Sequence, residues 1–157
     1  MSGQWIIEPA EVTGADAQGL LESLSQCLQQ ITGDSGVSSF SPREMAEQGA
    51  LFVVARNAKG VAVGCGALRP LKAGVAELKR MYAQPDSPGA GTKILQYLEA
   101  EARHLGYQHI WLETRRVNER AVGFYLARGY QQIENYGHYQ GRAEAICFAK
   151  NLNHEGW

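Results

Sequence analysis

The spacing of apolar residues in the first quarter of the chain predicts a strand, a helix and a loop. A short apolar run at residues 5–8 predicts the first strand. Apolar side chains then recur at helical spacing, so we expect a helix over residues 16–31. Residues 33–40 are rich in Gly and Ser and predict a loop. The expected apolar face of the helix consists of Leu20, Leu21, Leu24, Cys27, Leu28 and Ile31.

Strand signals dominate the middle of the chain. Residues 41–44 (Ser-Pro-Arg-Glu) place an N-cap, a first-turn proline and a capping-box glutamate in order, which predicts that a short helix begins there. The β-rich runs 51–55 and 61–65 are separated by the Asn-Ala-Lys-Gly of residues 57–60, which predicts a hairpin. Residues 75–83 predict the next strand.

The last part of the chain repeats a strand-helix order. Apolar residues at helical spacing between residues 94 and 105 predict a helix that begins near residue 90 and ends at Gly106. Asn118 can cap another helix that runs to Arg128 and ends at Gly129. This order of elements predicts one mixed sheet with helices on both faces. The remaining expected strands are residues 110–114, 130–133 and 145–150.

Composition and charge exclude several classes of protein. The 157 residues, of which 45% are hydrophobic, fit one domain over residues 1–157. A net charge of −1 gives no basic field that would favour nucleic acid as a partner. No apolar run approaches the ~20 residues of a membrane helix, and the amino terminus lacks a signal-peptide pattern. We therefore expect a cytoplasmic protein with neither a nucleic-acid nor a membrane partner.

The cysteines and histidines do not predict a metal site. Cys27, Cys65 and Cys147 share no metal or redox spacing, and we expect them to be reduced and buried. Cys65 and Cys147 lie mid-strand with no base nearby in the sequence, so neither is expected to be a nucleophile. The four histidines are scattered along the chain, as His104, His109, His138 and His154.

A strand, a tight Pro/Gly loop and the first turn of a helix follow one another over residues 77–95. The first backbone N–H groups of a helix lack intrahelical acceptors, and the helix dipole adds about half a positive charge, so such a turn suits phosphate. The loop is not a Walker A sequence, because it lacks the Gly-Lys-Ser/Thr ending. The alternative is that its glycines only permit a turn. The amides expected to contact phosphate are those of Gly89, Ala90, Gly91 and Thr92.

A second segment, residues 118–130, supports the interpretation of the glycine loop as a phosphate site. Residues 118–130 resemble the signature Asn-x-x-Ala-x-x-hydrophobic-Tyr-x-x-x-Gly-aromatic. With the glycine loop and an intervening strand, the chain resembles the GNAT family of acyl-CoA-dependent N-acyltransferases over nearly its whole length. The resemblance implies an α/β (α+β) fold with a single mixed, mostly antiparallel sheet of six to seven strands and helices on both faces. The chain departs from the family at Asp86, which replaces an Arg or Gln, and in a loop about two residues shorter. We expect Asp86 to face solvent.

The resemblance also implies a coenzyme site. Acetyl-CoA is the expected co-substrate, with no metal. The strand at residues 75–83 is expected to splay from the next strand, and its free edge pairs with the pantetheine amides. A backbone N–H there stabilises the negative charge that develops on the reacting carbonyl oxygen. The predicted coenzyme-binding residues are Met81, Tyr82, Ala83, Pro88, Gly89, Ala90, Gly91, Thr92, Asn118 and Tyr125.

Tyr125 and Glu77 are the predicted catalytic residues. By resemblance, the Tyr125 hydroxyl protonates the departing thiolate; the alternative is a core aromatic, because Ala121, Val122 and Tyr125 share one helical stripe. Glu77 is the candidate general base, and its alternative is an ordinary solvent-facing carboxylate. Glu113 on the neighbouring strand is the second candidate.

Strand alternation would place Glu77, Lys79, Met81 and Ala83 on one face. Residues 136–142 form either a surface loop or one wall of the acceptor site, which residues 33–42 would face from the other side.

The expected function is transfer of acetyl from acetyl-CoA to a primary amine of a small molecule, such as an amino acid, polyamine or antibiotic, by direct attack in a ternary complex. Two alternatives are a non-catalytic acyl-CoA-binding sensor and a simple interaction domain. The resemblance to the GNAT family also allows a homodimer.

Overall fold

The computed structural model describes residues 5–36 and 40–152, and in this part of the chain seven strands form one sheet. Their order is β1-β2-β3-β4-β5-β7-β6. Strands β4 and β5 pair in parallel, and the other neighbouring pairs are antiparallel. The predicted mixed, mostly antiparallel sheet is confirmed. The strands are β1 (Ile6–Pro9), β2 (Leu51–Arg56), β3 (Ala62–Lys72), β4 (Val75–Ala83), β5 (His109–Arg115), β6 (Gln131–Ile133) and β7 (Ala145–Asn151).

Helices cover both faces of the sheet, as predicted. The helix α1 (Ala15–Thr32) packs on one face, and α2 (Ala90–His104) and α3 (Glu119–Ala127) pack on the other. The short helix expected after Ser41 is the 3-10 helix η2 (Pro42–Ala46), and a second one, η3 (Gly137–Tyr139), precedes β7. Among the described helices, none combines the length and the hydropathy needed to cross a bilayer.

Strand β3 is longer than predicted. The sequence pattern ended this strand at Cys65, but it continues to Lys72. Gly66 and Pro70 weaken the strand signal, and each has a structural reason. A Cβ atom at Gly66 would lie 2.8 Å from the sulfur of Met81 and 2.9 Å from a methyl group of Leu98, so the side chains that pack over β3 leave no room for one there. Pro70 lies beyond the last pairing with β2, where one edge of the strand needs no N–H donor.

A β-bulge interrupts β4. Its pairing with β3 steps from Cys65–Tyr82 to Ala67–Lys79, so two residues of β4, Arg80 and Met81, oppose the single Gly66 of β3. The extra residue is Arg80, which has φ +56°, a conformation rare outside glycine. The bulge lies where β4 leaves its other neighbour, β5.

The bulge changes the face of the sheet on which the side chains after it lie. Met81 and Ala83 pack in the core cluster beneath α2. Glu77 and Lys79 lie on the opposite face, where Lys79 approaches η2. The prediction that these four residues share one face assumed unbroken alternation and is wrong, because the bulge inserts one residue.

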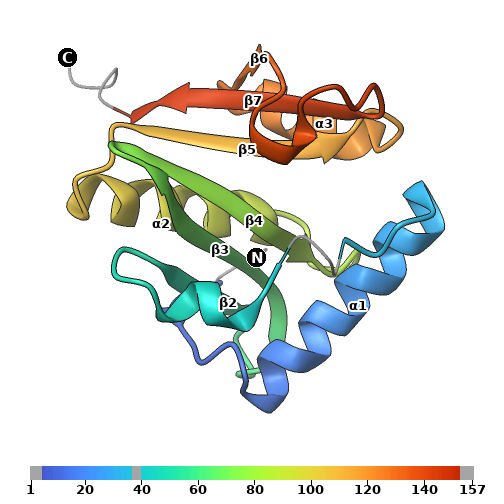
Figure 1. Ribbon diagram of the computed structural model, residues 1–157. Coiled ribbons are helices and arrows are strands. Elements are labelled where there is room, and N and C mark those ends of the chain that lie inside the picture. Colours follow the sequence, from blue (N-terminus) through green and yellow to red (C-terminus); the bar gives the residue numbers. More distant parts are fainter. Residues whose placement is uncertain (1–4, 37–39, 153–157) are drawn as a thin grey trace.

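Strands β4 and β5 separate partway along their length. Their pairing covers only Val75–His109, Ala76–Ile110 and Glu77–Trp111. From residue 78 to residue 83, the edge of β4 that faces β5 is unpaired, and Figure 1 shows the two strands diverging. The expected splay is therefore confirmed.

The sheet covers only the first part of the apolar face predicted for α1. Leu20 and Leu24 are buried, whereas Cys27 and Ile31 are exposed. The expectation that all three cysteines are buried is therefore wrong for Cys27 and correct for Cys65 and Cys147.

Candidate active site

A cleft of about 770 Å³ occupies the space between the diverging strands. Its walls come from α1, β4, the loop before α2, β5, α3 and the segment after β6. The structure thus brings together residues as far apart in the sequence as Leu24 and Arg142. Of the predicted site residues, those that line the cleft are Glu77, Met81, Tyr82, Ala83, Pro88, Gly89, Gly91, Thr92, Glu113, Asn118 and Tyr125.

The start of α2 forms one end of this cleft. Gly89 is the N-cap and has φ +88°, which its lack of a side chain permits. Ala90, which does not line the cleft, donates its N–H to Ser87 O at 3.1 Å. Within the described chain, the amides of Gly89, Gly91 and Thr92 find no acceptor. Three of the four predicted amides are therefore available to an anion.

The surroundings of this end suit a diphosphate. Asp86 is exposed and does not line the cleft, as expected. The Arg128 guanidinium donates to Thr92 Oγ1 from Nη2 (2.7 Å) and from Nε (3.1 Å). It also lies 3.9 Å from the centre of the Phe124 ring. A cation thus stands beside the open amides, in a geometry that favours phosphate.

Sequence reasoning missed Arg128. It occupies an unspecified position of the signature segment, directly before Gly129. Its contact with Thr92 joins residues 36 positions apart, so no local pattern could indicate it.

Asn118 and Tyr125 lie on the α3 wall. The Asn118 side chain accepts a hydrogen bond from the N–H of Ala121 at 3.2 Å, so the predicted cap is confirmed. Tyr125 is 7% exposed and packs edge-on against Phe124 and Tyr130. Burial raises its pKa above the ordinary value, so the phenol keeps its proton at neutral pH.

Glu77 is buried, so the alternative that it is an ordinary solvent-facing carboxylate is wrong. It is 4% exposed, and both carboxylate oxygens have partners. Oε1 accepts from Arg69 Nη1 at 3.0 Å, and Oε2 accepts from the Tyr136 hydroxyl at 2.7 Å. Lys79 Nζ lies 3.9 Å from Oε1.

Glu113 has a different environment on the other wall. Its Oε2 atom is buried without a hydrogen-bond partner in the described chain. The nearest cation is Arg115, with Nε 3.6 Å away. Burial raises the pKa of Glu113 to about 7, and Arg115 opposes this shift.

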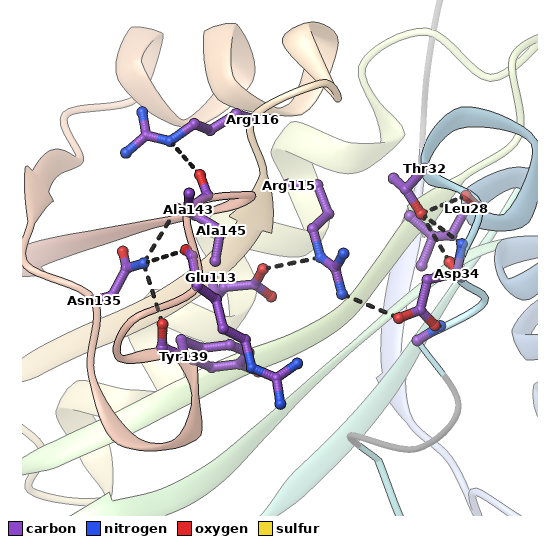
Figure 2. A network of polar contacts seen from close by, with 12 residues as sticks. Leu28, Thr32, Asp34, Glu113, Arg115, Arg116, Asn135, Tyr139, Ala143 and Ala145 are labelled. Carbon is purple, nitrogen blue, oxygen red and sulfur yellow. Dashed lines mark hydrogen bonds and ion pairs between the residues drawn. The ribbon is translucent and has the colours of Figure 1, made fainter.

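Arg115 also links two parts of the cleft wall. Its Nη2 atom lies 3.0 Å from Asp34 Oδ2, and Asp34 Oδ1 accepts from the N–H of Gly36 at 2.9 Å. Figure 2 shows Arg115 between Glu113 and Asp34. The segment after α1 is therefore tied to the end of β5.

The two segments expected at the acceptor side do border the cleft. His138, Tyr139 and Arg142 come from one of them, and Asp34 and Gly36 from the other. Residues 136–142 include η3 and the buried Tyr136 and Tyr139, so they are more ordered than a simple surface loop. The positions 37–39 lie outside the described residues.

Among the described residues, the cysteines and histidines form neither a nucleophilic site nor a metal site. Burial raises the pKa of Cys65 to about 12 and that of Cys147 to about 11, which disfavours the thiolate that a nucleophile needs. The described residues contain no group of three or more His, Cys, Asp or Glu that could hold a metal ion. His154 lies outside them.

The chain is similar in sequence to known proteins. The sequence model of the acetyltransferase (GNAT) family matches residues 17–130. An IAA acetyltransferase of Azospirillum brasilense is 30% identical over 123 residues, which cover 76% of this chain and 80% of that protein.

Solved structures show the same fold. A Klebsiella pneumoniae protein classed as an acyl-CoA N-acyltransferase superposes with a TM-score of 0.80 at 27% identity, covering 95% of this chain and 98% of that one. The PaiA N-acetyltransferase of Thermoplasma acidophilum, solved in complex with coenzyme A, has a TM-score of 0.68 at 19% identity, covering 95% and 99%. Since the family match spans more than half of the sequence, this chain belongs to the GNAT family of acetyltransferases.

Proposed function

We propose that the protein transfers the acetyl group of acetyl-CoA to a primary amine of a small molecule, by direct attack while both substrates are bound. The observation that supports this is one continuous cleft. It runs from open amides at the start of α2, along an unpaired edge of β4, to the buried carboxylate of Glu77 and the partly buried carboxylate of Glu113.

The residues present fit a ligand that carries both a diphosphate and amide groups. The amides of Gly89, Gly91 and Thr92, with Arg128 beside them, would hold the diphosphate. The unpaired edge at residues 81–83 offers backbone groups to the amides of the pantetheine. When bound, the coenzyme supplies the acetyl group as a reactive thioester.

Tyr125 is the proposed general acid. It lines the cleft, and burial keeps its phenol protonated, so it can give a proton to the leaving thiolate. Its aromatic packing holds the ring in one place, so the core role and the catalytic role are compatible.

Glu113 is the better supported of the two candidate bases. The oxygens of Glu77 are engaged by Arg69 and Tyr136, and a proton accepted there would compete with these contacts. Glu113 has an oxygen without a hydrogen-bond partner among the described residues and a pKa of about 7, which suits proton transfer at neutral pH. In this proposal Glu77 organises the acceptor side of the cleft.

Two experiments test the proposal in sequence. Thermal unfolding with acetyl-CoA at a hundredfold excess over the dissociation constant should show a gain of about 2.7 kcal/mol. Release of coenzyme A thiol against a panel of amines should then show turnover. Initial velocities at varied concentrations of both substrates should give intersecting rather than parallel lines, because no covalent acyl-enzyme forms.

The alternatives predict other results. A non-catalytic acyl-CoA-binding sensor would be stabilised by acetyl-CoA but release no thiol with any amine. A simple interaction domain would show neither effect. A cytoplasmic location and a homodimer remain expectations, and the amine panel does not depend on them.

A further inference from the structure

We propose that the acceptor amine also carries a carboxylate, and that Arg80 binds this carboxylate inside the cleft. The inference rests on the proposed transferase function and specifies its substrate class. An amine of the amino-acid type fits it, whereas a polyamine or an aminoglycoside does not.

Arg80 has only neutral partners in the described structure. Its Nη2 atom donates to the Ser25 hydroxyl at 2.7 Å, and Nη1 donates to the Ser35 carbonyl at 3.4 Å. Its Nε atom is buried without a hydrogen-bond partner among the described residues. The guanidinium forms no ion pair with any of these residues, and it lines the cleft.

A half-buried guanidinium without an anion is an unfavourable arrangement. Burial lowers the pKa of Arg80, which means that the surroundings disfavour its charge. The backbone at Arg80 is also in a conformation that residues other than glycine rarely adopt. Strained residues and unpaired charges of this kind occur mostly at binding sites, where a ligand supplies the missing partner.

The other charges on the cleft wall support an anionic ligand. On the acceptor side, Arg115 is paired with Asp34 and Lys79 lies near Glu77. Arg80 forms no ion pair with a described residue, and the exposed Arg142 attracts Asp34 electrostatically without forming an ion pair with it. A polycationic acceptor would meet this surplus of positive charge, whereas a carboxylate would neutralise it.

The carboxyl-terminal half of α1 adds an apolar wall next to Arg80. Leu24, Leu28 and Ile31 line the cleft from the same helix that carries Ser25. An acceptor that carries a carboxylate and an apolar side chain would contact both features. Phenylalanine and leucine are therefore suitable probes, together with their carboxamides, which keep the amine and the side chain but lack the negative charge.

The test compares thiol release by the full chain with phenylalanine, phenylalaninamide and spermidine, all in the presence of acetyl-CoA. We expect kcat/KM for phenylalanine to exceed that for phenylalaninamide by about tenfold or more. The lower amine pKa of the carboxamide provides more neutral amine, so amine basicity alone would give the opposite order. Spermidine should be the poorest acceptor.

The variant Arg80→Gln should bring the ratio between the two acceptors close to one, and Arg80→Lys should restore part of it. The control Ser25→Ala removes the tie to α1 but keeps the charge, so the ratio should stay at the wild-type value. If Arg80 only positions α1, Ser25→Ala will change the ratio as Arg80→Gln does, and the inference is overturned.

A binding measurement separates this inference from the transferase function. Calorimetry with N-acetylphenylalanine and its carboxamide should show tighter binding of the carboxylate to the wild type and no preference in Arg80→Gln. Thiol release that is equal for carboxylate and carboxamide, or fastest with spermidine, would refute the inference and leave the transferase function intact. Absence of thiol release with every amine would refute both.

Discussion

The Oε2 atom of Glu113 lies 3.6 Å from Nε of Arg115, two residues further along β5, and this oxygen has no hydrogen-bond donor in the described chain. Residues two apart on a strand share a face, so the pair lies together on the cleft wall. Burial raises the pKa of Glu113 to about 7, and the guanidinium limits that rise. Glu113 is therefore poised to accept a proton near neutral pH.

Replacement of Arg115 should change the pH dependence of catalysis. In Arg115→Gln the charge that favours ionised Glu113 is gone, so the pKa of Glu113 rises further. The acidic limb of the kcat/KM profile should then move to higher pH. Thiol release measured between pH 5.5 and 9 gives the profile. Arg116→Gln is the control, because Arg116 is exposed and its side chain bonds the Ala143 carbonyl rather than Glu113 or Asp34. An unmoved limb would favour Glu77 as the base.

The raised pKa of Glu113 should also make the free energy of unfolding depend on pH, and this can be measured without any substrate. The pKa of Glu113 is about 7 in the folded protein, against an ordinary value of 4.5, so the folded state binds a proton that the unfolded chain has already lost. Stability from this group is present below pH 4.5 and is lost as pH rises through 7. The neutral Glu113→Gln should therefore gain about 2–3 kcal/mol relative to wild type between pH 4 and pH 8.

Denaturant unfolding at both pH values measures this gain. Glu134→Gln is the control, since Glu134 is exposed and is not among the charges that shift the pKa of Glu113. A difference between Glu113→Gln and wild type that stays constant with pH would contradict the raised pKa.

The sequence predicted most elements of the fold because their patterns are local. The helix from Ala90 to His104 and the strand from Val75 to Ala83 have apolar residues at the right period, and the cap at Asn118 needs only neighbouring residues. The strand that continues from Cys65 to Lys72 was missed, because Gly66 and Pro70 are acceptable only next to particular neighbours.

The candidate site was predicted less completely, for a related reason. Gly89, Gly91 and Tyr125 carry signals within one segment each, and all three line the cleft. The bulge at Arg80 has no sequence signal, because an arginine rarely adopts its backbone conformation. The burial of Glu77 depends on partners from distant segments, which no period reveals.

Loss of the Tyr125 hydroxyl should affect turnover more than folding. Tyr125→Phe keeps the ring packed against Phe124 and Tyr130 but removes the proton donor. Turnover in the thiol-release assay should fall by roughly 10². Tyr97→Phe provides a control, because Tyr97 packs against the same core cluster but does not line the cleft. Near-wild-type turnover of Tyr125→Phe would leave Tyr125 a packing role only.

Side chains of increasing size at Gly91 should separate coenzyme binding from folding. A methyl group there would lie 3.6 Å from the Phe124 ring, an ordinary contact, so Gly91→Ala should fold normally. Gly91→Val should block the approach of phosphate to the open amides and lower acetyl-CoA affinity by at least about tenfold. Calorimetry measures the affinity, and thermal unfolding without ligand verifies the fold. Wild-type affinity in Gly91→Val would argue against this end of the cleft as the diphosphate site.

A buried ion pair behind the cleft should control stability rather than catalysis. Glu99 Oε2 accepts from the Tyr130 hydroxyl at 2.8 Å and lies 3.2 Å from Lys150 Nζ, which also donates to the Arg128 carbonyl at 3.0 Å. Lys150→Ala leaves the buried Glu99 carboxylate without its cation, which should cost about 3 kcal/mol. For a chain of this size that lowers the melting temperature by roughly 6–12 °C.

The double variant Lys150→Met with Glu99→Leu removes both charges of this pair, so no carboxylate remains buried without a partner. It should recover most of the stability that Lys150→Ala loses, because the penalty comes from the uncompensated charge and not from the absence of the pair. Tyr130 then loses the acceptor of its hydroxyl, which limits the recovery by about 1 kcal/mol. Calorimetric melting temperatures of the single and double variants show whether the loss comes from the uncompensated charge or from the missing ion pair. A double variant as unstable as Lys150→Ala would mean that the ion pair itself stabilises the contact between α2 and β7.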